Sequence, residues 1–329
     1  MRKNRIPLAP VRERAITNGG FSCGWVGDRM NYYSEPEKIM DFADVNRITE
    51  EAFARHGKGW QHLSVTTPAA PPSGKHASMH GADGLRECRA PGRNPFPAIC
   101  RVMDARTILP VALMNTAALA DIRTGAAGAI AAKHLCRKKE IVLGLIGTGR
   151  RAQNQLDAIA HEFTIREVMI WSRNEKEAEL FRQANSRYDI SFRNQKRTCD
   201  CDVLVTSTSS ETRVVKARWI HPGTHINAVG SDAPGKQELD PSLLVLGSVI
   251  VDDPELAIRA GEINVPIKQG FFQPSDIAGT LGEVVRGEKG RTREDQITIF
   301  DSAGLDLADP ALVSIVTRFG RSTGVPFIA

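Results

Sequence analysis

The chain has 329 residues, of which 41% are hydrophobic and 25% are charged, a composition typical of a soluble globular protein with room for two domains. Its formal net charge of +5 is diffuse, and short basic clusters such as 137–139 contain no aromatic residues, which argues against nucleic-acid binding. No apolar run approaches the roughly 20 residues that span a bilayer, and the basic opening 1–14 lacks the apolar stretch of a secretory leader. We therefore expect a cytoplasmic protein that binds neither nucleic acid nor membranes.

The six cysteines are scattered along the chain, and the nearest two, Cys199 and Cys201, are separated by a single residue. Zinc knuckles and redox pairs use a longer spacing. We expect reduced thiols and no metal site.

The first third of the chain is only partly readable. Residues 1–30 show no hydrophobic period and are interpreted as an amino-terminal extension. Apolar residues recur at helical spacing over 35–56, where Pro36 suits an early helical position and Gly57 a stop. Residues 63–100 are rich in Pro, Gly and Ser and show no convincing alternation, so no element is assigned there.

The pattern becomes regular after residue 100. A strand pair around a turn near Thr107 is predicted over 101–114, and an alanine-rich helix over 121–135. Strands and helices then alternate: strands are predicted at 141–146, 167–171, 202–206, 225–229 and 248–251, and helices at 152–163, 175–186 and, near the end, 312–318. This alternation is typical of a parallel sheet covered by helices on both faces.

Residues 147–152 form a G-x-G-x-x-A pattern that directly follows an apolar strand and opens a helix. In this context the first glycine permits a tight turn, the second lets the backbone approach a pyrophosphate, and the small third residue allows close packing of helix on strand. Backbone N–H groups at the helix start would face the phosphates. The alternative is a glycine turn without a ligand. The predicted dinucleotide contacts are Gly147, Thr148, Gly149, Arg150, Arg151 and Ala152.

The end of the second strand of this unit indicates which dinucleotide binds. An NAD site has an acidic residue about 20 positions beyond the glycine turn. This chain has Ser172 and Arg173 there, a hydroxyl and a cation that can hold the 2′-phosphate of NADP. We therefore predict NADP in preference to NAD. In the alternative interpretation, Arg173 is a solvated surface residue.

Several strings resemble the ornithine cyclodeaminase / mu-crystallin family, which includes alanine dehydrogenases and ketimine reductases. They are IRTGAAGAIAAKHL (122–135), GLIGTGRRAQNQL (144–156), HINAVGSDAPGKQELD (225–240), GEIN (261–264), TLGEVVRG (280–287) and ITIFDSAGLDLAD (297–309). The resemblance runs almost unbroken from Val111 to Asp309.

The resemblance implies an α/β fold in which a Rossmann-type, doubly wound parallel sheet is inserted in a smaller α+β domain. Residues 1–122 would form the domain for substrate binding and dimerisation, and 123–309 the dinucleotide-binding domain. Residues 310–329 would form a helix that returns to the first domain. Family members are usually homodimers, so a homodimer is implied as well.

The matching strings also imply roles for single residues. Arg123 corresponds to the arginine that binds the substrate carboxylate, a task suited to its planar fork. Asp232 corresponds to the aspartate that handles the substrate amine, where a carboxylate can hold an ammonium or relay its proton. The alternative for Asp232 is a plain turn residue. The cofactor contacts implied in the same way are Thr124, Asn227, Val229 and Ser302.

The chain departs from the family pattern over 63–100. Family members have a substrate-binding lysine there, and Arg86 is its nearest counterpart. Arginine keeps the charge, but it is bulkier and does not donate a proton near neutral pH. An earlier basic residue of the family has no secure counterpart, Lys75 being the nearest. An unusual substrate, a degraded pocket and a frameshift confined to this stretch each account for the departure.

These features predict an NAD(P)-dependent oxidoreductase that acts on a small 2-amino or 2-imino acid, of the alanine dehydrogenase or imine reductase type. Two alternatives stay open. One is an ammonia lyase of the ornithine cyclodeaminase type that uses bound NAD. The other is a mu-crystallin-like binding protein that has lost catalysis.

Overall fold

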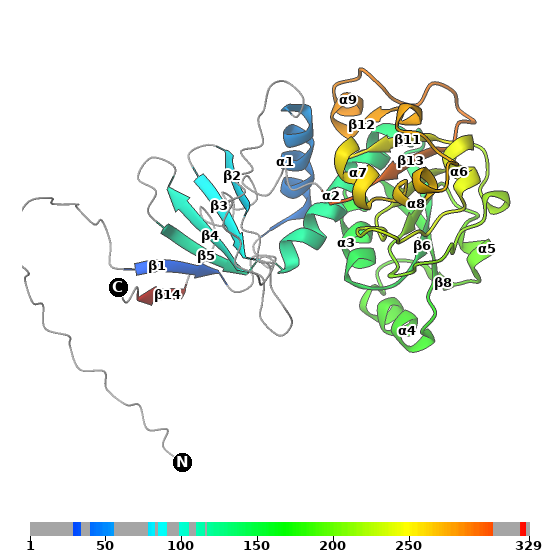
Figure 1. Cartoon of the computed structure of the whole chain (residues 1–329). Helices are drawn as coiled ribbons and strands as arrows, with labels where there is room; N and C mark the ends of the chain where they lie inside the picture. Colours follow the sequence, from blue (N-terminus) through cyan, green and yellow to red (C-terminus); the bar gives the residue numbers. More distant parts are fainter. Residues whose placement is uncertain are drawn as a thin grey trace, which may run out of the picture.

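The structure is a computed structural model that describes residues 29–33, 40–55, 78–82, 85–90, 99–104, 110–115, 117–304 and 323–326. Two sheets organise the chain, one of six strands and one of eight (Figure 1). No helix in these ranges is long and apolar enough to cross a membrane.

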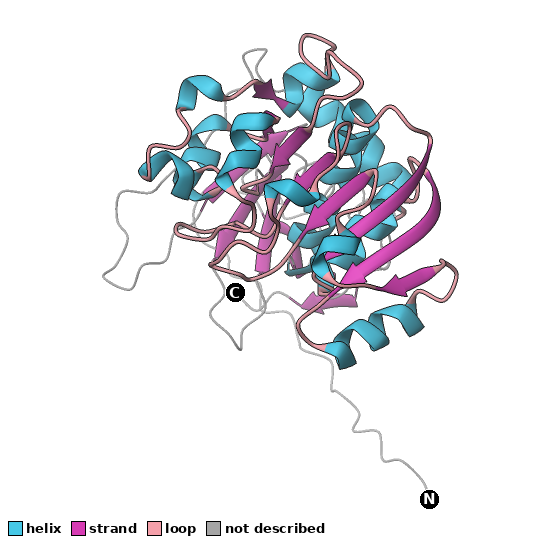
Figure 2. Cartoon of the chain, turned by 90° about the vertical axis from the view of Figure 1, so that its right-hand side faces the viewer, coloured by secondary structure: helices cyan, strands magenta, loops and turns pink. Residues whose placement is uncertain are grey.

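The larger sheet is parallel throughout, and its strand order is β12-β11-β13-β10-β9-β6-β7-β8. Helices cover both of its faces (Figure 2), as the alternating pattern predicted. Its strands are β6 (Glu140–Ile146), β7 (Thr164–Trp171), β8 (Ile190–Phe192), β9 (Val203–Thr206), β10 (His225–Ala228), β11 (Ser248–Val251), β12 (Gly279–Thr280) and β13 (Thr298–Asp301).

The helices of the described chain are α1 (Phe42–Arg55), α2 (Ala117–Leu135), α3 (Arg150–Ile159), α4 (Glu175–Ala184), α5 (Gln195–Thr198), α6 (Pro241–Leu246), α7 (Pro254–Ala260), α8 (Asn264–Lys268) and α9 (Leu281–Val285). Strand β6 shows why the sheet needs helices on both sides, because six of its seven residues are buried. Leu143 and Leu145 join a hydrophobic cluster with α3, whereas Val142 and Ile146 join a second cluster on the other face. A strand that is apolar on both faces is stable only between two layers.

The six-stranded sheet has the order β14-β1-β5-β4-β3-β2. Its strands are β1 (Arg29–Tyr33), β2 (Ser78–Ala82), β3 (Leu85–Ala90), β4 (Ile99–Asp104), β5 (Pro110–Asn115) and β14 (Thr323–Pro326). Strand β14 follows the parallel sheet in sequence and pairs antiparallel with β1, which precedes it. The parallel sheet is therefore inserted within the smaller unit, which confirms the predicted fold class.

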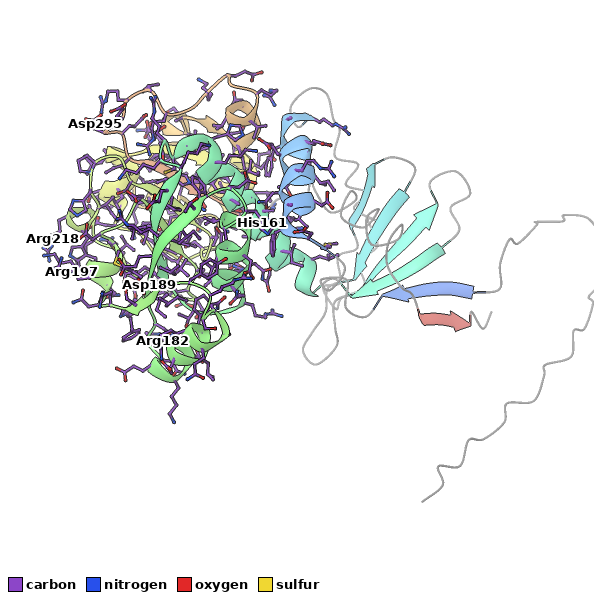
Figure 3. All side chains as sticks on the ribbon, turned by 180° about the vertical axis from the view of Figure 1, so that it is seen from behind. His161, Arg182, Asp189, Arg197, Arg218 and Asp295 are labelled. Atoms are coloured by element: carbon purple, nitrogen blue, oxygen red, sulfur yellow. The ribbon has the colours of Figure 1, made fainter. Side chains whose placement is uncertain are left out.

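The helix α1 packs against α2, α9 and α3, and so connects the first part of the chain to the parallel-sheet unit. In the view from behind, His161 lies beside α1, whereas Arg182 of α4 lies at the lower end of the parallel-sheet unit (Figure 3). His161 Nε2 also lies 3.7 Å from Oδ1 of Asp41, the residue before α1.

Several predicted elements are confirmed, and others need correction. The strand pair at 101–114 corresponds to β4 and β5, which pair antiparallel. The helix expected over 35–56 begins at Phe42, because Asp41 caps it: the Asp41 carboxylate accepts a hydrogen bond from the Ala43 N–H, and its carbonyl accepts one from the Val45 N–H. Strands β2 and β3 form a hairpin in the stretch 63–100, to which no element was assigned.

The amino-terminal and carboxyl-terminal segments also differ from expectation. Strand β1 begins within the stretch interpreted as an extension. The helix predicted at 312–318 lies outside the described residues, and 323–326 is a strand and not part of a helix. The boundary expected between residues 122 and 123 falls inside the continuous helix α2.

Candidate active site

The candidate site lies where the parallel sheet changes its direction of growth. Strands β7 and β8 lie on one side of β6, and β9 lies on the other. Ligands of open parallel sheets bind outside the carboxyl ends of the strands at such a point. A cavity of about 530 Å³ occurs there. It is lined by Gly147, Thr148, Gly149, Trp171, Ser172, Arg173, Asn174, Glu177, Ser207, Thr208, Ser209, Ser210 and Val214.

The glycine turn between β6 and α3 forms one wall of this cavity. Gly147 has φ +105°, and a Cβ atom there would lie 2.9 Å from the carbonyl oxygen of Ser207, so the position requires glycine. Gly149 has an ordinary φ of −81°, and a Cβ atom on it would meet nothing within 4 Å. Glycine at 149 therefore keeps space open at the cavity. Ala152 is fully buried, as close packing of α3 on the sheet requires.

The start of α3 is prepared for an anion. Most neighbouring helices have a side-chain cap, for example Asn174 at α4 and Asp253 at α7, but α3 has none. Its first backbone N–H groups therefore have no side-chain acceptor. The hydroxyl oxygens of Thr148 and Ser207 are buried and have no hydrogen-bond partner among the described residues, although buried hydroxyls normally have one. The open glycine, the uncapped helix and these two hydroxyls fit a dinucleotide pyrophosphate.

The far end of the cavity follows β7. Ser172 Oγ accepts a hydrogen bond of 3.2 Å from the Asn174 N–H, which keeps Ser172 in the turn before α4. Among the described residues that line the cavity, Arg173 and Glu177 carry charge, and both are exposed. Ser172 and Arg173 therefore lie in one cavity with the glycine turn, as an adenosine-ribose subsite requires. Glu177 was not foreseen, because it belongs to the helix and not to the strand end.

Residues of alternating charge connect α2, the start of α3 and the turn after β10. We call this set the charge chain, and its five members are Asp121, Arg150, Arg151, Asp232 and Lys236. Arg150 Nη2 lies 3.3 Å from Asp121 Oδ2, and Arg151 Nε lies 3.5 Å from Asp121 Oδ1. Arg151 Nη2 donates to Asp232 Oδ2 at 2.5 Å, and Lys236 Nζ donates to Asp232 Oδ1 at 2.6 Å. The guanidinium groups of Arg150 and Arg151 thus pair with carboxylates, and a contact of either with the cofactor phosphates stays a prediction.

Asp232 is half-buried among these cations. Burial by itself raises the pKa of its carboxyl group. The hydrogen bond from Lys236 and the charge of Arg151 outweigh burial and hold the pKa of Asp232 below its usual range. Asp232 is therefore an ionised carboxylate at neutral pH.

Two buried glutamates fix the loops around Asp232. Glu238 accepts hydrogen bonds from the N–H and hydroxyl of Thr208, both 2.6 Å, and from the Gly230 N–H at 3.0 Å. Glu262 accepts from the Ser231 hydroxyl at 2.5 Å and from the Glu238 N–H. Burial raises the pKa of both carboxyl groups. Sequence reasoning gave them no role, although the strings HINAVGSDAPGKQELD and GEIN contain them.

Arg123 lies on α2 and is almost fully buried, with 7% of its surface exposed. Its Nη2 donates to the carbonyl oxygen of Gly304 at 3.1 Å. The loop that contains Gly304 is held from the other side by Asp252, which accepts from the Gly304 N–H at 2.9 Å and from the Ser302 hydroxyl at 3.2 Å. Since this loop follows β13, Arg123 and Ser302 both lie at the carboxyl edge of the sheet.

Asn227 is placed differently from expectation. Its amide nitrogen donates to the Gly128 carbonyl at 3.0 Å and to Gln155 Oε1 at 3.1 Å. Its oxygen is 2.9 Å from Nε2 of the buried His225, whose pKa burial lowers to about 3. The Asn227 side chain therefore connects β10 with α2 and α3, and its contact with a cofactor stays a prediction.

Thr124 and Val229 are also engaged within the protein. The Thr124 hydroxyl donates to the Ala120 carbonyl at 2.8 Å within α2. The Val229 carbonyl accepts from Arg151 Nη1 at 3.0 Å. Both residues lie near the charge chain, and their contacts with a cofactor stay predictions.

Arg86 lies in β3, where its backbone is opposite Gly81 of β2 and Met103 of β4. Its side chain is outside the described set. A substrate contact by Arg86 therefore stays a prediction.

A larger hollow of about 820 Å³ lies at the opposite, amino-terminal edge of the parallel sheet. Two of its cations are engaged within the protein: Lys138 lies 2.6 Å from Asp202, and Arg291 donates to the carbonyl oxygens of Leu135 and Gln296. The carboxyl edge, although its cavity is smaller, therefore has the better claim to the chemistry. Within the described ranges no cluster of His, Cys, Asp and Glu is arranged to hold a metal ion.

Comparison with known proteins identifies the family. The profile of the ornithine cyclodeaminase/mu-crystallin family matches residues 85–321. Alanine dehydrogenase of Archaeoglobus fulgidus is 38% identical over 304 residues, which cover 88% of this chain and 94% of that protein.

Solved structures agree. An archaeal alanine dehydrogenase dimer with bound NAD has a TM-score of 0.83 at 34% identity, over 91% of this chain and 100% of that chain. The Δ¹-pyrroline-2-carboxylate reductase of Thermococcus litoralis, in complex with NADH and L-proline, has a TM-score of 0.80 at 27% identity, over 90% of this chain and 100% of that one. With a matching profile over more than half of its length and relatives that share both its fold and its sequence, the chain belongs to the ornithine cyclodeaminase/mu-crystallin family.

Proposed function

We propose that the protein is an NAD(P)-dependent oxidoreductase that acts on a small 2-amino or 2-imino acid. The observation that carries the proposal is the cavity at the switch point, where an open glycine and an uncapped helix adjoin an ionised aspartate. Relatives named alanine dehydrogenase and Δ¹-pyrroline-2-carboxylate reductase, at 38% and 36% identity, act on substrates of this class.

The cofactor proposal follows from the cavity walls. The N–H groups at the start of α3, with Thr148 and Ser207, would hold the pyrophosphate. Ser172 and Arg173 would hold a 2′-phosphate, so we propose a preference for NADPH, with NADH as the second cofactor. When bound, the nicotinamide would exchange a hydride with carbon 2 of the substrate.

The substrate proposal assigns one charge to each end of the amino acid. Arg123 would bind the carboxylate through its planar fork, and Asp232 would pair with the ammonium or iminium nitrogen. Arg86 would add a second cation for the carboxylate or the side chain. Orientation by two opposite charges would hold carbon 2 within reach of the nicotinamide.

We also propose that the protein is a homodimer, since the archaeal structure with 34% identity is a dimer. As a separate proposal, the protein is cytoplasmic. Residues 1–122 and 310–329 would supply the dimer contacts, and 123–309 the cofactor domain. Light scattering of the purified protein should give twice the protomer mass of 35.9 kDa.

The test is a cofactor-turnover screen. The protein is mixed with NADPH or NADH and with small 2-oxo acids plus ammonia, or with cyclic 2-imino acids, and nicotinamide absorbance is followed. We expect stoichiometric oxidation of NADPH with at least one substrate. Release of ammonia from a diamino acid with bound NAD and unchanged absorbance would make the protein a cyclodeaminase. Cofactor binding without either reaction would make it a binding protein.

A further inference from the structure

The carboxylate of Asp232 already has a cation on each of its two oxygens. Lys236 lies 2.6 Å from Oδ1, and Arg151 lies 2.5 Å from Oδ2. A neutral carboxyl group would have to place a proton on one of these oxygens and break that contact. Both contacts therefore stabilise the ionised form, and they also fix the plane of the group.

We infer that Arg151 and Lys236 are positioning residues that hold Asp232 as a fixed, ionised carboxylate, suited to pair with a cationic substrate nitrogen and not to donate a proton to it. This inference rests on the proposed function, because it takes Asp232 as the partner of the substrate amine. It assigns Arg151 to the substrate side of the site, in contrast to the phosphate role that its place after the glycine turn suggests.

Arg151 cannot turn towards a phosphate without losing several contacts. Its Nη1 donates to the Val229 carbonyl at 3.0 Å, its Nη2 to Asp232, and its Nε lies 3.5 Å from Asp121. Asp121 lies on α2, two residues before the predicted carboxylate-binding Arg123. The Arg151 side chain therefore connects the start of α3 to Asp232 and to the helix α2 that contains Arg123.

The charges around Asp232 come from three elements. Helix α3 contributes Arg150 and Arg151, α2 contributes Asp121, and the turn after β10 contributes Lys236. With Asp232 itself the charge chain holds three cations and two anions. The surplus cation favours ionisation of Asp232, and a cationic substrate is still admitted because 29% of the Asp232 side chain is exposed.

The experiment compares Lys236→Met and Lys236→Arg with a matched control, Lys268→Met. Lys268 donates to Asn264 Oδ1 at 3.1 Å, and the same oxygen accepts from the Gly235 N–H at 3.2 Å, so Lys268 supports the same turn without contacting Asp232. The readouts are the carboxyl titration of Asp232 by ¹³C NMR, assigned through Asp232→Asn, and the pH profile of kcat/KM with NADPH.

We expect the pKa of the Asp232 carboxyl group in the wild type to lie below its usual range, because Lys236 and Arg151 stabilise the ionised form. Lys236→Met should raise its titration midpoint by about one pH unit or more, because an opposite charge at contact distance typically lowers a carboxyl pKa by 1–3. The acidic limb of the pH profile of kcat/KM should move to higher pH by the same amount. Lys236→Arg should restore the wild-type values, and Lys268→Met should leave them unchanged.

Arg151→Gln provides the second arm. We expect it to lower kcat/KM by about tenfold or more through the lost contact, with the dissociation constant of NADPH changed by less than about threefold. The inference is overturned if Lys236→Met leaves the titration midpoint of Asp232 unchanged, or if Lys268→Met shifts that midpoint equally. It is also overturned if Arg151→Gln weakens the binding of NADPH by a larger factor than it lowers kcat/KM. Full activity of Asp232→Asn would instead remove Asp232 from the proposed function itself.

Discussion

Gly149→Val should separate cofactor binding from folding. A Cβ atom at 149 would meet nothing within 4 Å, and the φ of −81° suits any residue, so the folded chain accepts valine. Valine is a poorer residue than glycine at the start of a helix, which should cost about 0.5–1.5 kcal/mol of stability. The added side chain would occupy the space through which a pyrophosphate reaches the N–H groups of α3.

The expected loss of affinity follows from those N–H groups. Each hydrogen bond to a charged phosphate oxygen contributes ~1.5–3 kcal/mol. Losing two of them should cost ~3–6 kcal/mol, or about 10²–10⁴-fold in Kd at 1.4 kcal/mol per tenfold. Titration of NADPH and NADH by fluorescence or calorimetry measures this loss, and urea unfolding measures stability.

Gly147→Ala is the matched comparison. Its φ of +105° and the 2.9 Å approach of a Cβ atom to the Ser207 carbonyl make alanine strained there, at about 1–3 kcal/mol. Gly147→Ala should therefore weaken folding first and binding as a consequence. The reasoning is refuted if Gly149→Val binds NADPH like the wild type, or if it lowers the free energy of unfolding by much more than ~1.5 kcal/mol.

Three further predictions concern the substrate, the cofactor and pH. Arg123→Ala should reduce kcat/KM by about tenfold or more while leaving the Kd of NADPH nearly intact, because a charge-assisted contact is lost; equal losses of both would mark Arg123 as structural. Ser172→Asp combined with Arg173→Ala should shift the ratio of Kd values towards NADH, less so at high salt because the phosphate contact is screened; tighter binding of NADH than NADPH by the wild type at low salt would contradict this. His225 has a folded pKa of about 3 against an ordinary 6.5, so the unfolded chain binds more protons between these values and stability falls as pH drops through them. The full shift of the His225 pKa corresponds to at most about 5 kcal/mol of unfolding free energy, at 1.36 kcal/mol per pKa unit. His225→Gln should flatten the dependence of unfolding free energy on pH between about 4 and 6.5, and parallel curves for the two proteins would count against it.

Much of the parallel-sheet unit was predictable because its signals are local. The run 141–146 is apolar at every position, and the glycine turn and helix follow it without a gap. A strand of this kind needs cover on both faces wherever it occurs, so its pattern survives without knowledge of the tertiary contacts. The smaller sheet gives weaker signals. Strand β2 reads Ser-Met-His-Gly-Ala and has no β-branched residue, so it is stabilised by pairing with β3 and not by its own propensity.

The composition of the candidate site could be predicted in part. Gly147, Gly149 and Ser172 line one cavity because the carboxyl ends of parallel strands meet at one edge, which follows from the order of the elements. Because they directly follow the glycine turn in the sequence, Arg150 and Arg151 also lie next to this cavity. The direction of their side chains was a separate matter, because Asp121 and Asp232 come from other elements and attract both guanidinium groups.

The sequence by itself therefore determined the parallel α/β unit, the glycine turn and the presence of Ser172 and Arg173 in place of a carboxylate after β7, since each depends on neighbouring residues. The insertion of this unit within a smaller domain was implied by the family resemblance, and the pairing of β14 with β1 shows it. The tertiary structure alone decided that Arg151 and Lys236 both contact Asp232, that Glu238 and Glu262 are buried beneath its turn, and that Glu177 enters the cavity. Lys236 is four positions from Asp232, but Arg151 is 81 positions away and Glu262 is 24 positions from Glu238, and a charge selects its partner by distance in space. No local pattern of residues records that distance.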